Sequence, residues 1–273
     1  MSRSRLHISL LSAACQRSGL ELNIPLFSDR ECTFSNSETT SSTEMLSTFR
    51  QNTPRTTSAH LNPIKYEGGR ASQHFHSSSQ RYMVTDVMPA TTAEHGRSFF
   101  NPPLHFHMYQ TEDFEIISGV ARYYLDGTTI VAKTGDKIHV PMNAFHRFEN
   151  ASESGEDLVV SFRLDRQNFE MEEKFFRNFF GYIDDTWKAK QQPSFFQLCL
   201  FLYAFRCPVV LPGLGEKSTF LARQISFFAM VIAGVVVGEW LLGYKRTYPE
   251  YYRGLEQKRK TKWGLRSGVA CDR

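Results

Sequence analysis

The chain has 273 residues, of which 41% are hydrophobic, and its formal net charge at neutral pH is +4. This length exceeds that of a usual single domain without requiring two full ones. The five cysteines are widely scattered and form no C-x-x-C pair, which argues against a disulfide framework or a zinc ribbon and fits a reducing compartment. No motif that combines aromatic and basic residues is visible, so we expect no nucleic-acid partner.

Residues 1–62 are predicted to form a leader that is either disordered or a targeting segment. The first twenty residues hold three arginines and no acidic residue, a composition that resembles a mitochondrial presequence. A disordered tail is an equally good interpretation of the same residues. Residues 33–60 are rich in Ser and Thr and cannot bury enough apolar surface to offset the entropy of ordering.

Residues 63–166 contain many short strand patterns punctuated by Gly and Pro, which predicts an antiparallel sandwich or a small barrel. Alternation along 104–108 would place His105 and His107 on one face of a strand, roughly 7 Å apart. Asp126-Gly127 predicts a tight hairpin, because a type I′ turn needs positive φ at both of its central residues. The other predicted strands are 81–88, 113–117, 120–125, 128–132, 137–140, 145–148 and 158–164.

Two segments of this region carry side chains suited to chemistry. The first reads His105-x-His107-x4-Glu112-x6-Gly119, and the second reads Gly135-x5-Pro141-x-Asn143-x2-His146-x3-Asn150. Together they provide three imidazoles and one carboxylate on two short strand-like blocks. Neutral imidazole and carboxylate are good ligands for divalent first-row transition metals.

These segments resemble the first and second sequence motifs of the cupin superfamily. The resemblance extends over roughly residues 64 to 165, and the short spacing between Gly119 and Gly135 is similar to that of compact, single-domain cupins. Two positions depart from the family pattern. Phe99 replaces a glycine often found six positions before the first histidine, and Asn143 replaces the glycine of a Pro-x-Gly turn. Asparagine tolerates left-handed backbone conformations, so the second departure is mild.

The resemblance implies an all-β core, a double-stranded β-helix or jelly-roll barrel with a metal inside one mouth. It implies four metal ligands: His105, His107, Glu112 and His146. The cofactor would be one divalent transition metal, with Fe(II) or Mn(II) favoured and Ni, Cu or Zn also compatible. Ordinary core or surface histidines are the alternative, but each additional ligand at the right offset is an independent coincidence. An aromatic substrate pocket could be lined by Phe106, Tyr109, Phe114, Tyr123 and Phe148, although such rings also build barrel cores.

The C-terminal part is predicted to hold an amphipathic helix (167–192), a hydrophobic membrane-associated region (193–244) and a basic tail (245–273). Of its two apolar runs, the one ending at Tyr244 approaches the roughly twenty residues that a membrane span needs, and it contains a G-x-x-x-G motif. The shorter run, 195–205, is followed by Arg206. One or both runs could span a membrane as C-terminal helices, with basic flanks placing the cupin in the cytosol. Alternatively, they lie on the membrane surface or cover an apolar face of a homodimer.

We therefore expect a metal-dependent cupin enzyme, associated with a membrane, that acts on a small organic substrate. In the cupin superfamily such chemistry is often oxidation by O2, so an oxidoreductase of dioxygenase type is the first expectation. An aromatic or natural-product substrate is suggested by the family resemblance alone. A non-oxidative lyase, isomerase or cyclase is the alternative within enzymes. A membrane-associated cupin that binds a ligand without turnover is the alternative outside them. The lipid partner would meet residues 195–244 and the basic tail.

Overall fold

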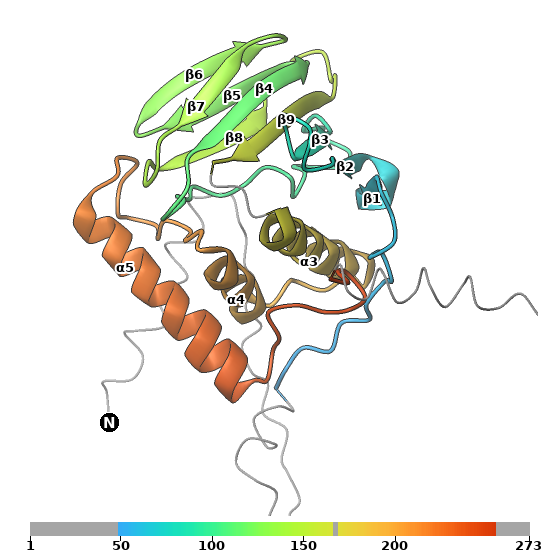
Figure 1. Cartoon of the computed structure of the whole chain (residues 1–273), viewed down its shortest axis with the longest axis vertical. Helices are drawn as coiled ribbons and strands as arrows, with labels where there is room; N and C mark the ends of the chain where they lie inside the picture. Colours follow the sequence, from blue (N-terminus) through green and yellow to red (C-terminus); the bar gives the residue numbers. More distant parts are fainter. Residues whose placement is uncertain (1–48, 166–168, 255–273) are drawn as a thin grey trace, which may run out of the picture.

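The computed structural model describes residues 49–165 and 169–254 of the chain. A strand-rich body is followed by a group of helices that lie against one side of it (Figure 1). In chain order the elements are β1 (Ile64–Tyr66), η1 (Glu67–Gly69), β2 (Ala71–Phe75), β3 (Val84–Met88), β4 (Glu112–Ser118), β5 (Val120–Leu125), β6 (Thr128–Lys133), β7 (Lys137–Val140), β8 (His146–Asn150), β9 (Leu158–Leu164), α3 (Phe169–Lys188), α4 (Phe195–Phe205), α5 (Phe220–Val231) and η2 (Ile232–Leu241).

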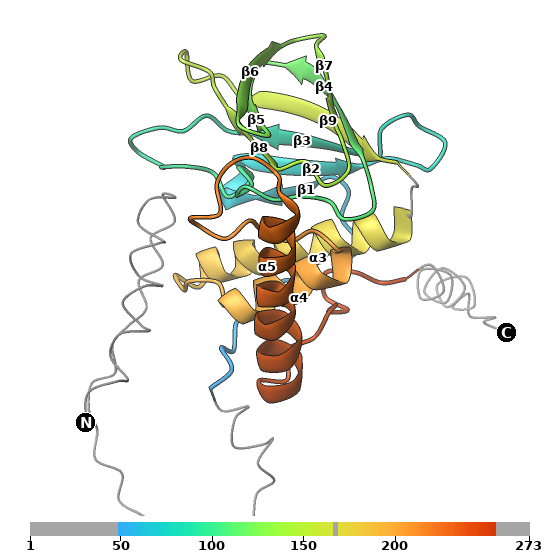
Figure 2. The same cartoon turned by 90° about the vertical axis from the view of Figure 1, so that its left-hand side faces the viewer.

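The strands form two antiparallel sheets that face each other. The larger sheet has the order β1-β2-β3-β9-β4-β7, and the smaller one has the order β6-β5-β8. Seen from the side, the sheets curve around a common interior while α3 and α4 lie beneath (Figure 2). The predicted cupin-type jelly-roll barrel followed by C-terminal helices is confirmed.

The register of the larger sheet follows from the alternation of apolar and polar residues in its strands. Phe114 of β4 lies opposite Phe162 of β9, and both are buried. Since successive side chains point to opposite faces, a slip by one residue would move every apolar side chain of a strand to the outside. Glu112 has the same parity as Phe114, so β4 holds this carboxylate inside the barrel together with the apolar core.

Turn chemistry was predicted correctly at two positions. Asp126 and Gly127 both have positive φ, 46° and 77°, as a type I′ hairpin requires. Asn143 has a φ of 67° and therefore occupies the left-handed conformation for which a glycine would normally be used. This turn directly precedes β8, whose first residue is His146.

Residues 104–108 do not form a regular strand but pair with segments on both of their sides. His105 bridges to His146 on one side and to Val209 on the other. The second partner belongs to residues 206–210, which we call the strap. Backbone hydrogen bonds from Phe106 to Pro208 O (3.1 Å) and from Met108 to Arg206 O (3.2 Å) extend this pairing. The predicted boundary at residue 193 therefore does not separate the barrel from the apolar region in space.

Helix α3 covers the lower side of the barrel with its phenylalanines, as the amphipathic pattern predicted. Phe176 meets Phe162 of β9 edge to face, with ring centroids 5.4 Å apart. Phe180 stacks on Phe100 at 4.4 Å. These contacts close the barrel interior on the side from which the helices approach (Figure 2).

The two apolar runs form helices that pack against each other. Helix α4 lies between α3 and η2, and Leu200 in it is fully buried. A Cβ atom on Gly234 would lie 2.7 Å from the backbone of Cys199, so the G-x-x-x-G motif brings η2 close to α4. Helix α4 has 11 residues, well short of the about 20 that a span needs, so the predicted possibility of two spanning helices is wrong. The continuous helix Phe220–Leu241 is long and apolar enough to cross a membrane.

The prediction of a leader through residue 62 is wrong for residues 49–62, which lie on the body of the protein. The backbone N–H of Thr56 donates to Asp185 at 2.6 Å, and the N–H of Ser58 donates to the carbonyl of Glu250 at 2.9 Å. Arg177 donates to the carbonyl of Leu61. Hydrogen bonds to α3 and to the chain near Glu250 hold this segment. Because these contacts are polar, the low apolar content of the segment did not predict that it is ordered. Residues 1–48, and the tail beyond residue 254, lie outside the described residues.

Candidate metal centre

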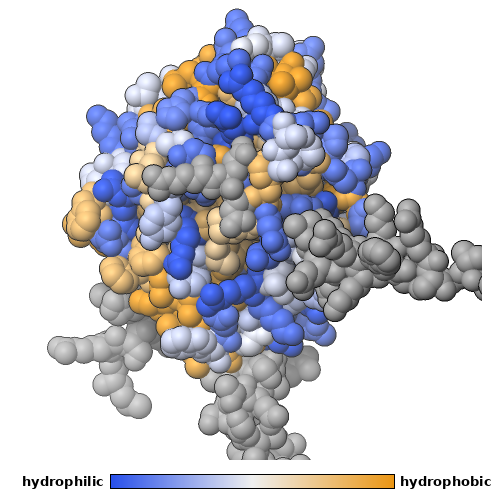
Figure 3. All heavy atoms as spheres, viewed as in Figure 1, coloured by the Kyte–Doolittle hydropathy of each residue, from blue (hydrophilic) through white to orange (hydrophobic). Residues whose placement is uncertain are grey.

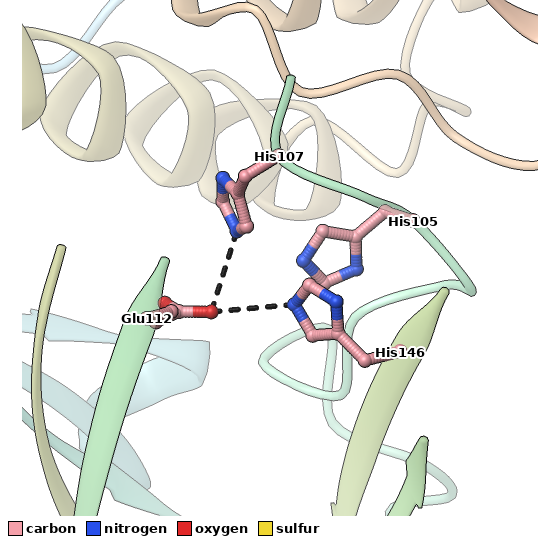
Figure 4. A group of neighbouring side chains, drawn as sticks. All are labelled: His105, His107, Glu112 and His146. Atoms are coloured by element: carbon pink, nitrogen blue, oxygen red, sulfur yellow. Dashed lines mark hydrogen bonds and ion pairs between the residues drawn. The ribbon is translucent and has the colours of Figure 1, made fainter. Parts of the chain in front are cut away.

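The four predicted ligands come together at one end of the barrel (Figure 4). Glu112 opens β4 and His146 opens β8, while His105 and His107 project from the segment between the strap and β8. Each of the four residues offers one ligand atom, and these atoms all lie within 4.8 Å of one another. His107, Glu112 and His146 are buried, and His105 is partly exposed.

Hydrogen bonds to backbone carbonyls set the tautomers of two histidines. Nδ1 of His105 lies 2.8 Å from the carbonyl of Pro103, and Nδ1 of His146 lies 3.0 Å from the carbonyl of Ala144. Because a carbonyl only accepts, each Nδ1 must carry the proton and each neutral ring keeps its lone pair on Nε2. This is the arrangement in which metal-binding imidazoles are usually held by their surroundings.

Electrostatics favour an anionic carboxylate at Glu112. Oε2 of Glu112 lies 3.3 Å from Nε2 of both His107 and His146 (Figure 4). Burial acts to raise the pKa of Glu112, but the two imidazoles outweigh it and hold that pKa well below its usual range. For His105, burial and then the charges of His146 and His107 place the pKa well below its ordinary value.

The donor set fits a divalent cation. Among the described residues, Nδ1 of His107 has no hydrogen-bond partner, and its Nε2 has only the 3.3 Å contact with Glu112, although the side chain is just 5% exposed. A buried polar atom without a partner is costly, and a metal ion would satisfy it. The Nε2 lone pair of His146 faces a carboxylate oxygen of Glu112. Because both atoms are acceptors, a cation or a proton must lie between them. Three imidazole nitrogens and one carboxylate oxygen suit Fe(II) or Mn(II) and are compatible with other first-row metals.

The predicted aromatic pocket is divided between two places. Phe114, Tyr123 and Phe148 pack together inside the barrel, with Tyr123 stacked on Phe148 at 5.1 Å. Phe106 instead packs against Phe145 in a separate cluster, and Tyr109 is 56% exposed. Phe106 and Tyr109 thus lie apart from the cluster inside the barrel, and a pocket lined by all five residues stays a prediction. Phe106 alternates with His105 and His107 along its segment and therefore points the other way.

Sequence reasoning missed a wall of this site that comes from far downstream. The ring of Phe205, at the end of α4, meets His107 edge-on at 6.0 Å and stacks on Phe175 of α3 at 4.0 Å. The strap that follows it runs beside the two histidines. The sequence does not indicate that Phe205 lies beside the metal site, because any buried helix would have a similar apolar composition.

Comparison with known proteins agrees with the fold. The family model described as "Cupin domain" matches residues 98–161, which include all four ligands. The chain is 34% identical over 155 residues to the "Probable oxidoreductase virH" of Hypocrea virens, covering 56% of this chain and 68% of that protein. The chain belongs to the cupin superfamily.

Two further relatives and one solved structure are also similar to this chain. "Oxidoreductase OpS7" of Beauveria bassiana is 26% identical over 223 residues, covering 72% of this chain and 73% of the relative. "Oxidoreductase iacF" of Pestalotiopsis fici is 35% identical over 117 residues, covering 40% of this chain and 57% of the relative. Among solved structures, an RmlC-like cupin from Shewanella frigidimarina matches with a TM-score of 0.29 and 20% identity, covering 40% of this chain and 89% of that one.

Proposed function

We propose that this cupin is a metal-dependent oxidoreductase of dioxygenase type that acts on a small organic molecule. The observation that carries the proposal is the convergence of His105, His107, Glu112 and His146, whose ligand atoms lie within 4.8 Å of one another. The oxidoreductase class is supported by relatives at 26–35% identity that bear this name. Small stand-alone cupins also resemble tailoring enzymes of natural-product pathways, which suggests an aromatic or other natural-product substrate.

A divalent metal held by these four residues would bring O2 and substrate together or polarise a substrate oxygen. The residues of this chain would orient the metal ligands and provide the negative charge. The carbonyls of Pro103 and Ala144 fix the orientation of two imidazoles, and Glu112 supplies the negative charge that a cation requires. The ring of Phe205, with Phe175 stacked on it, meets His107 from the helical side.

The proposal is tested first by metal content. We expect the purified full-length protein to hold about one equivalent of Fe(II) or Mn(II). Replacing a ligand, in His146→Ala, should weaken metal binding more than the roughly 10–100-fold typical of losing an outer-shell partner. The matched control is His139→Ala, which removes an exposed histidine paired with Asp113 and should leave metal content unchanged. A folded chain that stays metal-free under metal-replete conditions contradicts the proposal.

O2 consumption separates the proposed oxidation from its alternative. A lyase, isomerase or cyclase would use the same ligands with the metal as a Lewis acid, and its turnover would consume no O2. Uptake of O2 in step with substrate loss, measured with an oxygen electrode, supports the proposed oxidation. Substrate loss at the same rate without oxygen supports the alternative, and tight binding without substrate loss supports a ligand-binding module.

We also propose that the helix Phe220–Leu241 attaches the cupin to a lipid membrane. One side of this helix packs on α4, and the other exposes large apolar side chains: Phe220, Leu221, Ile225, Phe228, Ile232, Trp240 and Leu241. A corresponding apolar area covers the lower left of the surface in Figure 3. Exposed Arg50, Lys245 and Arg246 lie by the C-terminal end of the helix, where cations and a tryptophan favour a headgroup region.

Flotation with vesicles of phosphatidylcholine and phosphatidylserine tests this attachment. We expect the full-length protein to float with these vesicles and to bind more weakly to vesicles without the anionic lipid. A soluble homodimer that ignores vesicles would assign the exposed apolar side to a second copy of the chain instead. Orientation with the cupin domain in the cytosol is the arrangement expected from the positive flank.

A further inference from the structure

The pairing between the strap and residues 104–108 has a fixed register. His105 lies opposite Val209, so His107, two residues further along, lies opposite Cys207. The backbone N–H groups of Phe106 and Met108 donate to the carbonyls of Pro208 and Arg206, which agrees with this antiparallel register. His105 and His107 are thus at non-hydrogen-bonded positions relative to the strap, where side chains come closest, with Cβ atoms about 4.5–5.5 Å apart.

Side chains directly opposite each other lie on the same face of a pair of strands. His105 and His107 point toward Glu112 (Figure 4). Cys207 and Val209 therefore face the same side, and they continue the inner surface of the metal centre beyond His107. Phe205, whose ring edge meets His107, extends this surface one step further.

The thiol of Cys207 is close to the centre without belonging to the ligand group. The residue is 4% exposed, and burial and then the negative charge of Glu112 raise the pKa of its thiol well above the ordinary value. The four ligand atoms lie within 4.8 Å of one another, and this group does not include the sulfur of Cys207. The thiol therefore lies beside the ligands without being one of them.

Independent of the cysteine, unpaired polar atoms point to a ligand in the same place. Among the described residues, Nδ1 of His107, the residue opposite Cys207, has no hydrogen-bond partner, and its Nε2 meets only Oε2 of Glu112, at 3.3 Å. The hydroxyl of Tyr123, fully buried in the barrel, also lacks a partner among them. Buried polar groups are nearly always satisfied, so atoms left without partners near a set of metal ligands indicate where metal and substrate would bind.

We propose that Cys207 is a substrate-contacting residue, and that it forms with Val209 and Phe205 a wall against which the hydrocarbon part of a metal-chelating substrate lies. This inference rests on the proposed metal-dependent function and specifies its substrate class. A thiol, an isopropyl group and a phenyl ring attract apolar carbon and offer no charge to a phosphate or a sugar acid. The substrate class is therefore a small organic molecule with an oxygen-containing chelating end and an apolar body.

Two hydroxamic acids with the same chelating group test the wall. Acetohydroxamate has a methyl group and benzohydroxamate has a phenyl ring, and both are titrated against the Co(II)-loaded full-length protein by its visible absorption bands. Cys207→Leu adds bulk beside His107 and should weaken the binding of benzohydroxamate at least roughly tenfold more than that of acetohydroxamate, in line with the cost of a misfitted methylene-sized group. The matched control, Cys199→Ala, changes a buried thiol of α4 and should alter neither affinity.

A second measurement on the unmodified sequence does not depend on how a variant folds. Methyl methanethiosulfonate is applied to the Co(II)-loaded protein, and modification of each cysteine is followed by peptide mass mapping. Bound benzohydroxamate should slow modification of Cys207 at least fivefold and leave that of Cys199 unchanged. Equal rates at Cys207 with and without benzohydroxamate, or hydroxamates that do not bind the metal-loaded protein, overturn the inference.

Metal content separates failure of this inference from failure of the proposed function. A full-length protein that binds no Co(II), Fe(II) or Mn(II) overturns both. A protein that binds the metal stoichiometrically, but whose two hydroxamate affinities respond equally to Cys207→Leu, overturns the substrate wall alone. A Cys207→Ser variant that keeps the metal and the preference for benzohydroxamate while lowering its affinity supports contact through the sulfur position.

Discussion

The two apolar runs of the C-terminal part have similar composition but very different surroundings. In α4, Leu200, Phe201 and Phe205 are at most 2% exposed. In the helix Phe220–Leu241, Phe228 and Ile232 are more than half exposed. The first run is core, enclosed by α3, η2 and the barrel side of the molecule, whereas the second contributes one side to the core and leaves the other uncovered.

This difference shows what hydropathy measures. An apolar run predicts that its side chains are removed from water, but it does not predict whether they contact protein or lipid. Scattered apolar side chains on a surface need no explanation, whereas a continuous exposed patch indicates a partner. Only the packing of the two helices distinguishes them: η2 presents Gly234 and Gly238 to α4 and turns bulkier side chains outward.

The largest expected effect separates the two helices by placing the same charge in each. Leu200→Asp removes a fully buried leucine and buries a carboxylate without a partner, so it should cost more than the roughly 2–5 kcal/mol of a core Leu→Ala change. Ile232→Asp, at a position 59% exposed, should change the free energy of unfolding by no more than about 0.5 kcal/mol. Thermal unfolding of both full-length variants measures the difference.

Vesicle flotation completes this comparison, because Ile232→Asp should abolish binding to anionic vesicles while the protein remains folded. Equal destabilisation by the two substitutions would show that the outer side of the helix is covered in solution. Size-exclusion chromatography would then report a dimer that Ile232→Asp converts to a monomer.

A smaller effect, with an informative sign, is expected at the contact between the helices. In an exposed helix, Gly→Ala stabilises by about 1 kcal/mol because alanine restricts the unfolded chain. At Gly234 the added methyl group would lie 2.7 Å from the backbone of Cys199 and Leu200, so the helices must separate. We expect Gly234→Ala to destabilise by roughly 1–3 kcal/mol, the usual cost of overpacking. Stabilisation in denaturant unfolding would show that η2 does not approach α4 so closely.

Much of the metal centre could be predicted because its information is local. His105, His107 and Glu112 lie within eight consecutive positions of the sequence. The turn at Asp126-Gly127 depends on the backbone preference of two residues. The fold that joins this segment to His146 followed from a family resemblance, which carries long-range information that spacing alone lacks.

The parts that sequence reasoning missed depend on contacts between distant segments. The pairing of Cys207 with His107 requires the chain to return to the barrel after two helices, and no periodic pattern encodes such a return. Residues 49–62 are held by hydrogen bonds to α3, among them that of Thr56 to Asp185, which polar composition cannot distinguish from solvation. Phe106 packs in one cluster with Phe145 and with Val210, which lies far downstream in the chain.

The smallest effect on stability is expected for two buried tyrosine hydroxyls, one with a hydrogen-bond partner and one without. Tyr123 and Tyr251 are both fully buried. The hydroxyl of Tyr251 donates to Asp185 at 2.7 Å, whereas that of Tyr123 has no partner among the described residues. Tyr251→Phe should therefore cost about 1.5–3 kcal/mol, the usual value for a hydrogen bond to a charged group.

Tyr123→Phe should be neutral or slightly stabilising, because it removes an unpaired buried hydroxyl and keeps the ring stacked on Phe148. Urea unfolding of the metal-free full-length protein measures both variants. A loss at Tyr123 as large as that at Tyr251 would mean that its hydroxyl is already satisfied within the folded chain. A loss that appears only when metal and benzohydroxamate are bound would instead assign this hydroxyl to the ligand, since the partner that it lacks in the barrel would then come from outside the chain.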